Sequence, residues 1–107
     1  MPGDALTVTF EKPSDAVVHA VVTVAAAGTA VQCPITSRCR EVRVQAATAN
    51  VGLIFVGESG VTNAGGASQG YSLAAGAVLG PLPLASPRQL WVNAASGGDR
   101  AVFLALQ

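Results

Sequence analysis

Residues 42–60 constrain the fold more than any other part of this chain, because they contain two strand-like runs joined by a small polar turn. The first run, residues 42–46, alternates apolar with polar side chains, which is the period of a strand with one buried face. Residues 48–50 supply turn formers, and residues 52–56 form a short apolar run that Gly57 closes. The segment therefore predicts a β-hairpin and a sheet scaffold.

Turn signals recur along the rest of the chain at roughly ten-residue intervals, which is typical of an all-β sandwich or barrel. No segment has a convincing helical period. We therefore expect an all-β fold, an antiparallel β-sandwich of jelly-roll-like form. The other expected elements are an edge or bulged strand at residues 31–36 (interrupted by Pro34), a strand at 71–73, a tight turn at 74–76, a proline-broken run at 78–83, and a hairpin of strands 90–94 and 101–106 about the turn 96–99.

The N-terminal residues 1–13 read as an extended arm, followed by a single domain over residues 14–107. Leu6, Val8 and Phe10 alternate with threonines, so the arm has the pattern of a strand that adds to the sheet edge of a neighbour. Residues 16–27 are rich in valine on both strand faces. A strand of this kind belongs in the middle of a sandwich or beneath another subunit.

The chain carries too little charge to shield its own surface from other proteins. Of its 107 residues, 50% are hydrophobic and 11% are charged, against a usual charged share of about 25%. The mean hydropathy is +0.48. Such a surface favours association with protein. Six basic and six acidic residues give zero net charge, so we expect no nucleic-acid partner. No apolar run reaches the ~18 residues of a membrane helix, and no secretory signal is evident, so we expect a protein made and kept in the cytoplasm.

Catalytic chemistry has few candidates, and we expect neither enzyme activity nor a cofactor or metal. His19 is the only histidine and lies in an apolar run, where a structural or interface role is favoured. Cys33 and Cys39 are expected to be reduced thiols, with a disulfide between them as the less favoured alternative. The acids are dispersed, and none forms the spaced pair of a glycosidase or a metal site. They are Asp4, Glu11, Asp15, Glu41, Glu58 and Asp99.

Two further features have open interpretations. Arg38, Arg40 and Arg43 form the only basic cluster, either a salt-bridge patch for another subunit or a solvated edge. Trp91 lies between Leu90 and Val92 in an expected strand, so either the tryptophan or its two neighbours face the core. A buried tryptophan would be structural, whereas an exposed one would mark a docking hot spot.

Four motifs together resemble a known family. They are NVGLIFVGESGV at residues 50–61, GYSLAAG at 70–76, LWVNAASGG at 90–98 and the closing strand VFLAL at 102–106. This series resembles small β-sandwich virion proteins of tailed bacteriophages, of the capsid decoration or cement type. The similarity covers residues 42–107, and residues 1–40 are not distinctive. The proline-rich segment 79–87 and the paired cysteines depart from the simple pattern, so the subfamily stays open.

The resemblance implies a structural protein of the virion that binds the major capsid protein and stiffens the head shell. It also implies self-association, with three copies around a local threefold axis of the shell. The alternatives are a head–tail or tail component, and a small-molecule or carbohydrate-binding sandwich with its site in the loop 60–70. The residues expected to contact partners are Leu6, Val8, Phe10, Arg38, Arg40, Arg43, Val61 and Asn63.

Overall fold

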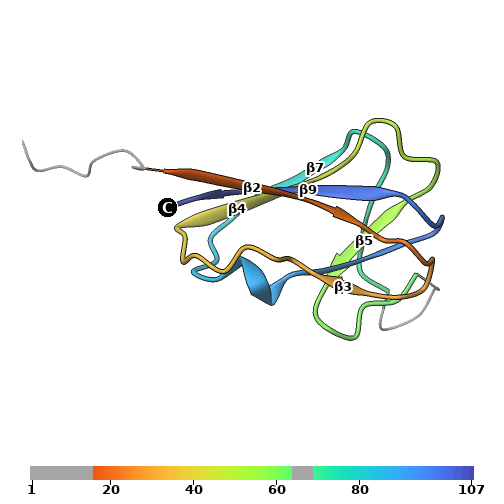
Figure 1. The fold of residues 1–107 in the computed structure, drawn as a ribbon, viewed down its shortest axis with the longest axis horizontal. Coiled ribbons are helices and arrows are strands. Elements are labelled where there is room, and N and C mark those ends of the chain that lie inside the picture. The colour runs from red at the N-terminus through yellow and green to blue at the C-terminus, as the bar shows by residue number, and fades with distance from the viewer. Residues whose placement is uncertain (1–15, 64–68) are drawn as a thin grey trace, which may run out of the picture.

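The computed structural model describes residues 16–63 and 69–107, and in them the chain forms two antiparallel four-stranded sheets packed face to face (Figure 1). The expected all-β sandwich is confirmed. The first sheet has the order β2 (Val17–Thr23), β9 (Arg100–Leu106), β4 (Glu41–Ala46), β7 (Val78–Leu82). The second has the order β3 (Val31–Gln32), β8 (Trp91–Ala94), β5 (Ile54–Gly57), β6 (Tyr71–Leu73). A short 3₁₀ helix, η1 (Pro87–Gln89), precedes β8. The expected arm, residues 1–13, lies outside the described residues.

Period-two patterning builds the core from the inward faces of both sheets. In β4 and β9 every second residue is fully buried, and the register places the two inward rows side by side. Ile54 and Val56 of β5 and Val92 of β8 close the core from the second sheet. Valine and alanine dominate, so Phe103 is the largest fully buried side chain. The inward rows of the two central strands are Val42, Val44 and Ala46 on β4, and Ala101, Phe103 and Ala105 on β9.

Both predicted hairpins are wrong, although their strands are where the sequence places them. β4 and β5 lie in different sheets, and so do β8 and β9. Of the seven connections between successive described strands, only β5 to β6 joins neighbours within one sheet. Turn residues show that a chain reverses, but they leave open whether the next strand pairs with its predecessor or packs across from it. Here Ile54 and Val56 of β5 are buried in the core between the two sheets, together with the inward residues of β4.

Hydrogen bonds join two of the corners at which the chain crosses from one sheet to the other, the β4–β5 corner and the β8–β9 corner. The Asp99 carboxylate, in the β8–β9 corner, accepts from the N–H groups of Val51 (2.9 Å) and Gly52 (2.8 Å) in the β4–β5 corner. Asn50 and Arg100 add a reciprocal pair: the Arg100 N–H donates to Asn50 Oδ1, and Asn50 Nδ2 donates to the Arg100 carbonyl, both at 2.8 Å. Asp99 is only 5% exposed. The two corners therefore form one hydrogen-bonded unit at the end of the sandwich.

The valine-rich strand β2 is an outer strand, so of the two places expected from its apolar faces the middle of the sandwich is wrong, and a place beneath another subunit stays a prediction. It pairs only with β9, with continuous register from Val17↔Leu106 to Thr23↔Arg100. Val22 and Val24 face the core, whereas Val17 and Val21 face outward. The short β3 is an edge strand, as Pro34 predicts. The turn at residues 74–76 is confirmed by the Ala77 N–H donating to the Ala74 carbonyl at 2.8 Å.

The corner unit makes a testable prediction about stability. Asp99→Ala leaves two main-chain N–H groups without their charged acceptor, so we expect the free energy of unfolding to fall by about 2–4 kcal/mol. Urea denaturation measures this change. The exposed Glu58 provides the control, because Glu58→Ala should change stability by less than about 0.5 kcal/mol. Equal effects of the two substitutions would contradict the role given to Asp99.

Candidate functional site

The outer face of the β2–β9–β4–β7 sheet carries several exposed apolar side chains that no described element covers. Val21 of β2, Val102 of β9, Gln45 of β4 and Val78 of β7 form one row across all four strands. The next rows bring Leu104 and Leu106 of β9 beside β2, both half-buried. The most exposed apolar side chains on this face are Val17 (59%), Val21 (54%) and Val78 (53%). An unpartnered sheet face of this composition is suited to contact with protein.

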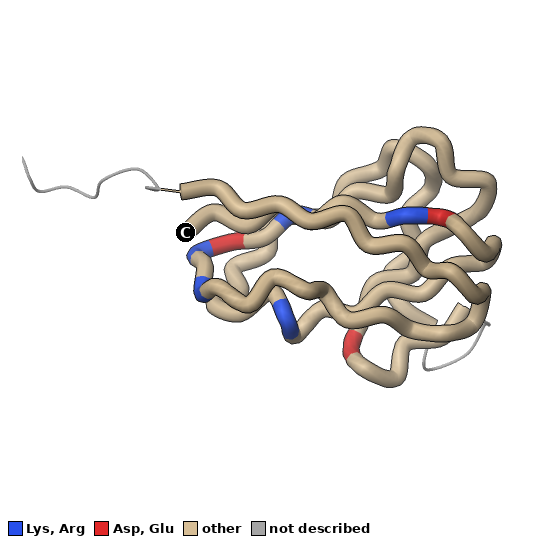
Figure 2. The backbone as a smooth tube through the Cα atoms, in the orientation of Figure 1, with Lys and Arg blue, Asp and Glu red and all other residues tan. Residues whose placement is uncertain are grey.

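Few charged groups interrupt this face. Glu41 and Arg43 are two residues apart on β4 and form a loose ion pair of 4.0 Å, with half of the Arg43 side chain exposed. Arg38 and Arg40 lie in the bend that precedes β4, and the Arg40 N–H donates to the Leu106 carbonyl at 2.7 Å. Figure 2 shows basic residues at the end where β2 begins and the chain ends. The basic cluster is thus exposed at one end of the sheet, beside the apolar face.

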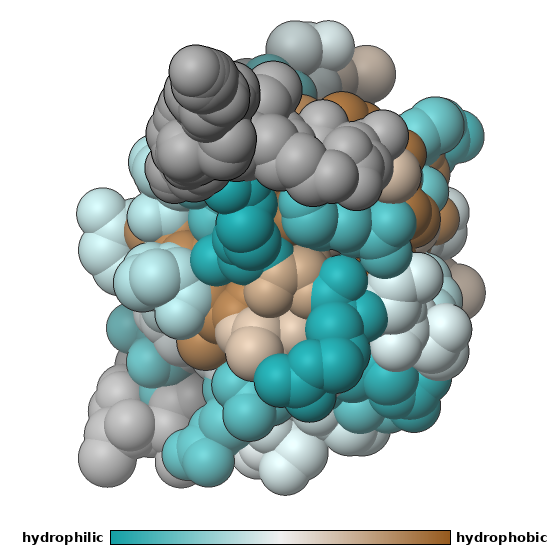
Figure 3. Space-filling model, turned by 90° about the vertical axis from the view of Figure 1, so that its left-hand side faces the viewer, coloured by the Kyte–Doolittle hydropathy of each residue, from teal (hydrophilic) through white to brown (hydrophobic). Residues whose placement is uncertain are grey.

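The same end of the molecule is apolar between the two sheets. Figure 3 views the structure from this side and shows hydrophobic residues in the middle, surrounded by hydrophilic ones. The bend there is fastened by main-chain hydrogen bonds, including one from the Cys39 N–H to the Ala85 carbonyl at 2.9 Å. This end of the sandwich therefore has an apolar centre with a hydrophilic rim.

The second sheet, in contrast, has much of its outer side covered by the chain itself. Phe55 and Asn93 are opposite each other in the β5–β8 register, on the side away from the core, and they are only 3% and 1% exposed. Asn93 Nδ2 donates to the Val61 carbonyl at 3.0 Å, and its Oδ1 accepts from the Gly28 N–H at 3.0 Å. Two loops are thereby fixed over this side of β8, so it offers less free surface than the first sheet.

The two loop residues predicted to contact a partner serve internal contacts. Val61 is 5% exposed, so its side chain offers a partner almost no surface. Asn63 is half-buried, and its Nδ2 donates to the Ala94 carbonyl at 2.9 Å. Of the remaining predicted residues, Arg38, Arg40 and Arg43 are exposed, and the arm residues Leu6, Val8 and Phe10 lie outside the described part. Partner contact by these six residues stays a prediction.

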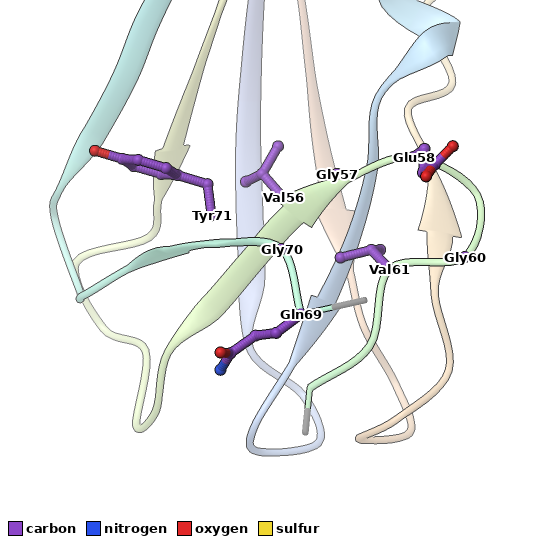
Figure 4. A pocket seen from close by; sticks show the side chains of 8 residues that line it. All are labelled: Val56, Gly57, Glu58, Gly60, Val61, Gln69, Gly70 and Tyr71. Atoms are coloured by element: carbon purple, nitrogen blue, oxygen red, sulfur yellow. The ribbon is translucent and has the colours of Figure 1, made fainter. Parts of the chain in front are cut away.

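A pocket of about 340 Å³ lies beside β5 and β6, in the region where the sequence suggests a small-molecule site. Glycines form much of its lining, and the side chains that carry chemistry do not converge on it. Figure 4 shows Tyr71 and Glu58 on opposite sides of the pocket, pointing away from each other. Tyr71 is 63% exposed. The lining residues are Val56, Gly57, Glu58, Gly60, Val61, Gln69, Gly70 and Tyr71.

Titratable side chains do not gather into a catalytic or metal-binding group in the part of the chain that the structure describes. No three His, Cys, Asp or Glu residues there come together as metal ligands. His19 is exposed on the outer face of β2, opposite Leu104. Cys33 and Cys39 are free thiols, and burial raises the pKa of each, so both stay protonated near neutral pH. The Cys39 Sγ donates to the Leu84 carbonyl at 2.9 Å.

Three residues have roles that the sequence patterns left open or did not reveal. Trp91 is half-buried while Leu90 and Val92 face the core, so the tryptophan lies on the outer side of the second sheet. Asn93 and Asp99 are the buried polar residues that fasten loops and corners. The position of Asn93 inside an apolar strand run was the one local sign of its role. Asparagine is disfavoured in strands unless its amide has hydrogen-bond partners.

Comparison with models of protein families, with curated proteins and with solved structures found no match to this chain. Within the described residues, no helix has the length and hydropathy needed to cross a membrane. The functional argument therefore rests on the faces of the sandwich and on the motifs in the sequence.

The packing beneath the pocket can be tested with two glycines. A Cβ on Gly70 would lie 2.5 Å from both the Val56 carbonyl oxygen and Val61 Cγ2, whereas a Cβ on Gly60 would meet nothing within 4 Å. We expect Gly70→Ala to lower the free energy of unfolding by about 1–3 kcal/mol, because main chain has to move. Gly60→Ala is the matched control and should change it by less than about 0.5 kcal/mol. Urea denaturation compares the two, and an unaffected Gly70 variant would contradict this packing.

Proposed function

We propose that this protein is a structural component of a tailed-phage virion that binds the major capsid protein and stabilises the head shell. The sequence motifs suggest the family, and one structural observation supports a docking role: the uncovered apolar outer face of the β2–β9–β4–β7 sheet. Val17, Val21 and Val78 are each more than half exposed there. The proposal places the protein on the surface of the capsid, after synthesis in the host cytoplasm.

The physical character of this face suits attachment to a shell. Valine side chains on a sheet make a flat contact, and each Å² of apolar surface removed from water contributes about 25 cal/mol. Only Glu41, Arg43 and Arg100 bring charge to the outward rows of the strands in this sheet. Few charged groups would therefore lose their hydration when a partner covers the centre of the face, and Arg38 and Arg40 would lie at its polar rim.

Several finer points belong to the same proposal. The arm, with Leu6, Val8 and Phe10, would add a strand to a sheet edge of the partner. Three copies around a local threefold axis stay a prediction drawn from the symmetry of shells. The jelly-roll topology is supported by two four-stranded sheets in which nearly every connection crosses between the sheets.

Binding to expanded, undecorated shells tests the docking face. We expect Val78→Lys to weaken binding about tenfold or more, because the partner would have to cover a charge where an exposed valine now meets it. Val51→Lys is the matched control, since Val51 is 87% exposed but lies in the β4–β5 corner, off this face. Co-sedimentation of shells with each folded variant gives the affinities.

The same assay tests the arm and the alternatives. A chain lacking residues 1–13 should stay folded and lose shell binding, and its unfolding would place the arm in the core. Equal binding by the two lysine variants would contradict the docking face. Binding of the native protein to tails or head–tail connectors, and not to shells, would favour the head–tail or tail alternative.

A small-molecule or carbohydrate-binding role is the second candidate, favoured by the pocket beside β5 and β6 with its exposed Tyr71. An aromatic ring next to polar groups is a common platform for sugars. A glycan array measures this directly. Binding that Tyr71→Ala abolishes, in a protein that does not bind shells, would replace the virion proposal.

A further inference from the structure

We propose that the edge of β2 opposite β9, its free edge because no other described strand pairs with it, is a self-association site, which pairs antiparallel with β2 of a second copy of this chain. The pairing would join the β2–β9–β4–β7 sheets of the two copies into one continuous eight-stranded sheet across a twofold axis. The pairing concerns the chain in solution, whereas the threefold arrangement in the proposed function is set by the shell, so shell binding tests the proposed function separately.

The first observation is the direction of the hydrogen-bonding groups of β2. The Gln107 N–H donates to the Ala16 carbonyl at 3.0 Å, and the Val24 N–H donates to the Asp99 carbonyl at 2.9 Å. In an antiparallel ladder, hydrogen-bonded and non-hydrogen-bonded pairs alternate. The even-numbered residues of β2 therefore bond to β9, while the N–H and C=O groups of the odd-numbered residues point to the free edge. These residues are Val17, His19, Val21 and Thr23.

The second observation is that β2 lacks the features that protect the other three sheet edges. β3 has two residues and is followed closely by Pro34, and β6 has three residues. β7 contains Pro81 and a register shift against β4. In contrast, β2 has seven residues in continuous register, with no proline and no charged side chain. Natural proteins block exposed edges with such features, so an edge that has none is suited to strand pairing.

The third observation favours a second copy as the occupant. Two copies of β2 are compatible in antiparallel pairing because neither carries a charge that would repel the other. Full overlap places the two copies of Ala20 opposite each other across the twofold axis, with His19 opposite Val21 and Val17 opposite Thr23 of the second copy. The exposed Val17 and Val21 of both copies then lie on one face. The pairing uses both edges completely, so it ends at a dimer and does not continue into a fibre.

The dimer would also enlarge the docking face described above. Joining two first sheets places the two outer faces side by side, because odd-numbered residues of β2 in both copies point to the same side. On a shell, a twofold contact of this kind would connect neighbouring decoration sites.

The experiment measures the mass of the full chain in solution. Sedimentation equilibrium from about 1 μM to about 1 mM should show a monomer–dimer equilibrium. Val21→Pro removes a main-chain N–H that points to the free edge and leaves the β2–β9 bonds intact, so it should raise the dimer dissociation constant about tenfold or more. Hydrogen exchange of the native protein gives a second measurement: the amides of Val17, His19, Val21 and Thr23 should exchange more slowly at high concentration.

The matched control is Val78→Pro on β7. Val78 is 53% exposed, against 54% for Val21. Its N–H also points to a free edge, because the neighbouring Ala77 is the residue bonded to β4, with the Ala46 N–H donating to the Ala77 carbonyl at 3.0 Å. This variant should dimerise like the native protein.

Four results would overturn the inference. They are a monomer at all concentrations, a trimer, a dimer that persists in folded Val21→Pro, and β2 amides whose exchange does not depend on concentration. A native monomer that dimerises only after removal of residues 1–13 would show that the arm of the same chain occupies the edge. Shell binding is measured separately, so a non-dimerising protein that still binds shells would refute this inference alone.

Discussion

The sandwich depends on how the chain satisfies its main-chain hydrogen bonds where it crosses from one sheet to the other. Almost every connection makes this crossing, and a buried corner without partners for its N–H and C=O groups would destabilise the fold. Asp99 supplies both carboxylate oxygens to the β4–β5 corner, and Asn50 exchanges two bonds with Arg100. Short side chains with oxygen acceptors therefore hold together corners that belong to four different strands.

A second consequence of this architecture is the difference between the two outer faces. Asn93 binds loops over the outer side of β8, so polar and aromatic residues there become buried. The first sheet has no comparable cover in the described residues, and its outward valines stay in solvent. With only 11% charged residues, the chain has little polar surface to separate these valines. Both proposals, a docking face and an assembly edge, follow from this one asymmetry.

The core shows why small side chains suit such a protein. Valine and alanine fill most inward positions, and Phe103 is the one large aromatic among the fully buried side chains of the described chain. Small inward side chains let the backbones of the two sheets approach closely. Close approach also occurs beside the pocket at β5 and β6, where Gly57 and Gly70 lie against Val61 and a larger residue would not fit.

The sequence by itself determined where the strands and turns lie, because alternation, β-branched residues and glycine or proline act within a few residues of the chain. Fold class, the edge position of β3 and the turn at residues 74–76 followed from these local signals. Only the tertiary structure decided which strand each one pairs with, so residues 42–60 became a sheet crossing and β2 became an outer strand. It also decided that Val61 faces inward and Trp91 outward. Pairing partners depend on burial summed over both sheets and on distant contacts such as Asp99 with Val51, and no local pattern carries that information.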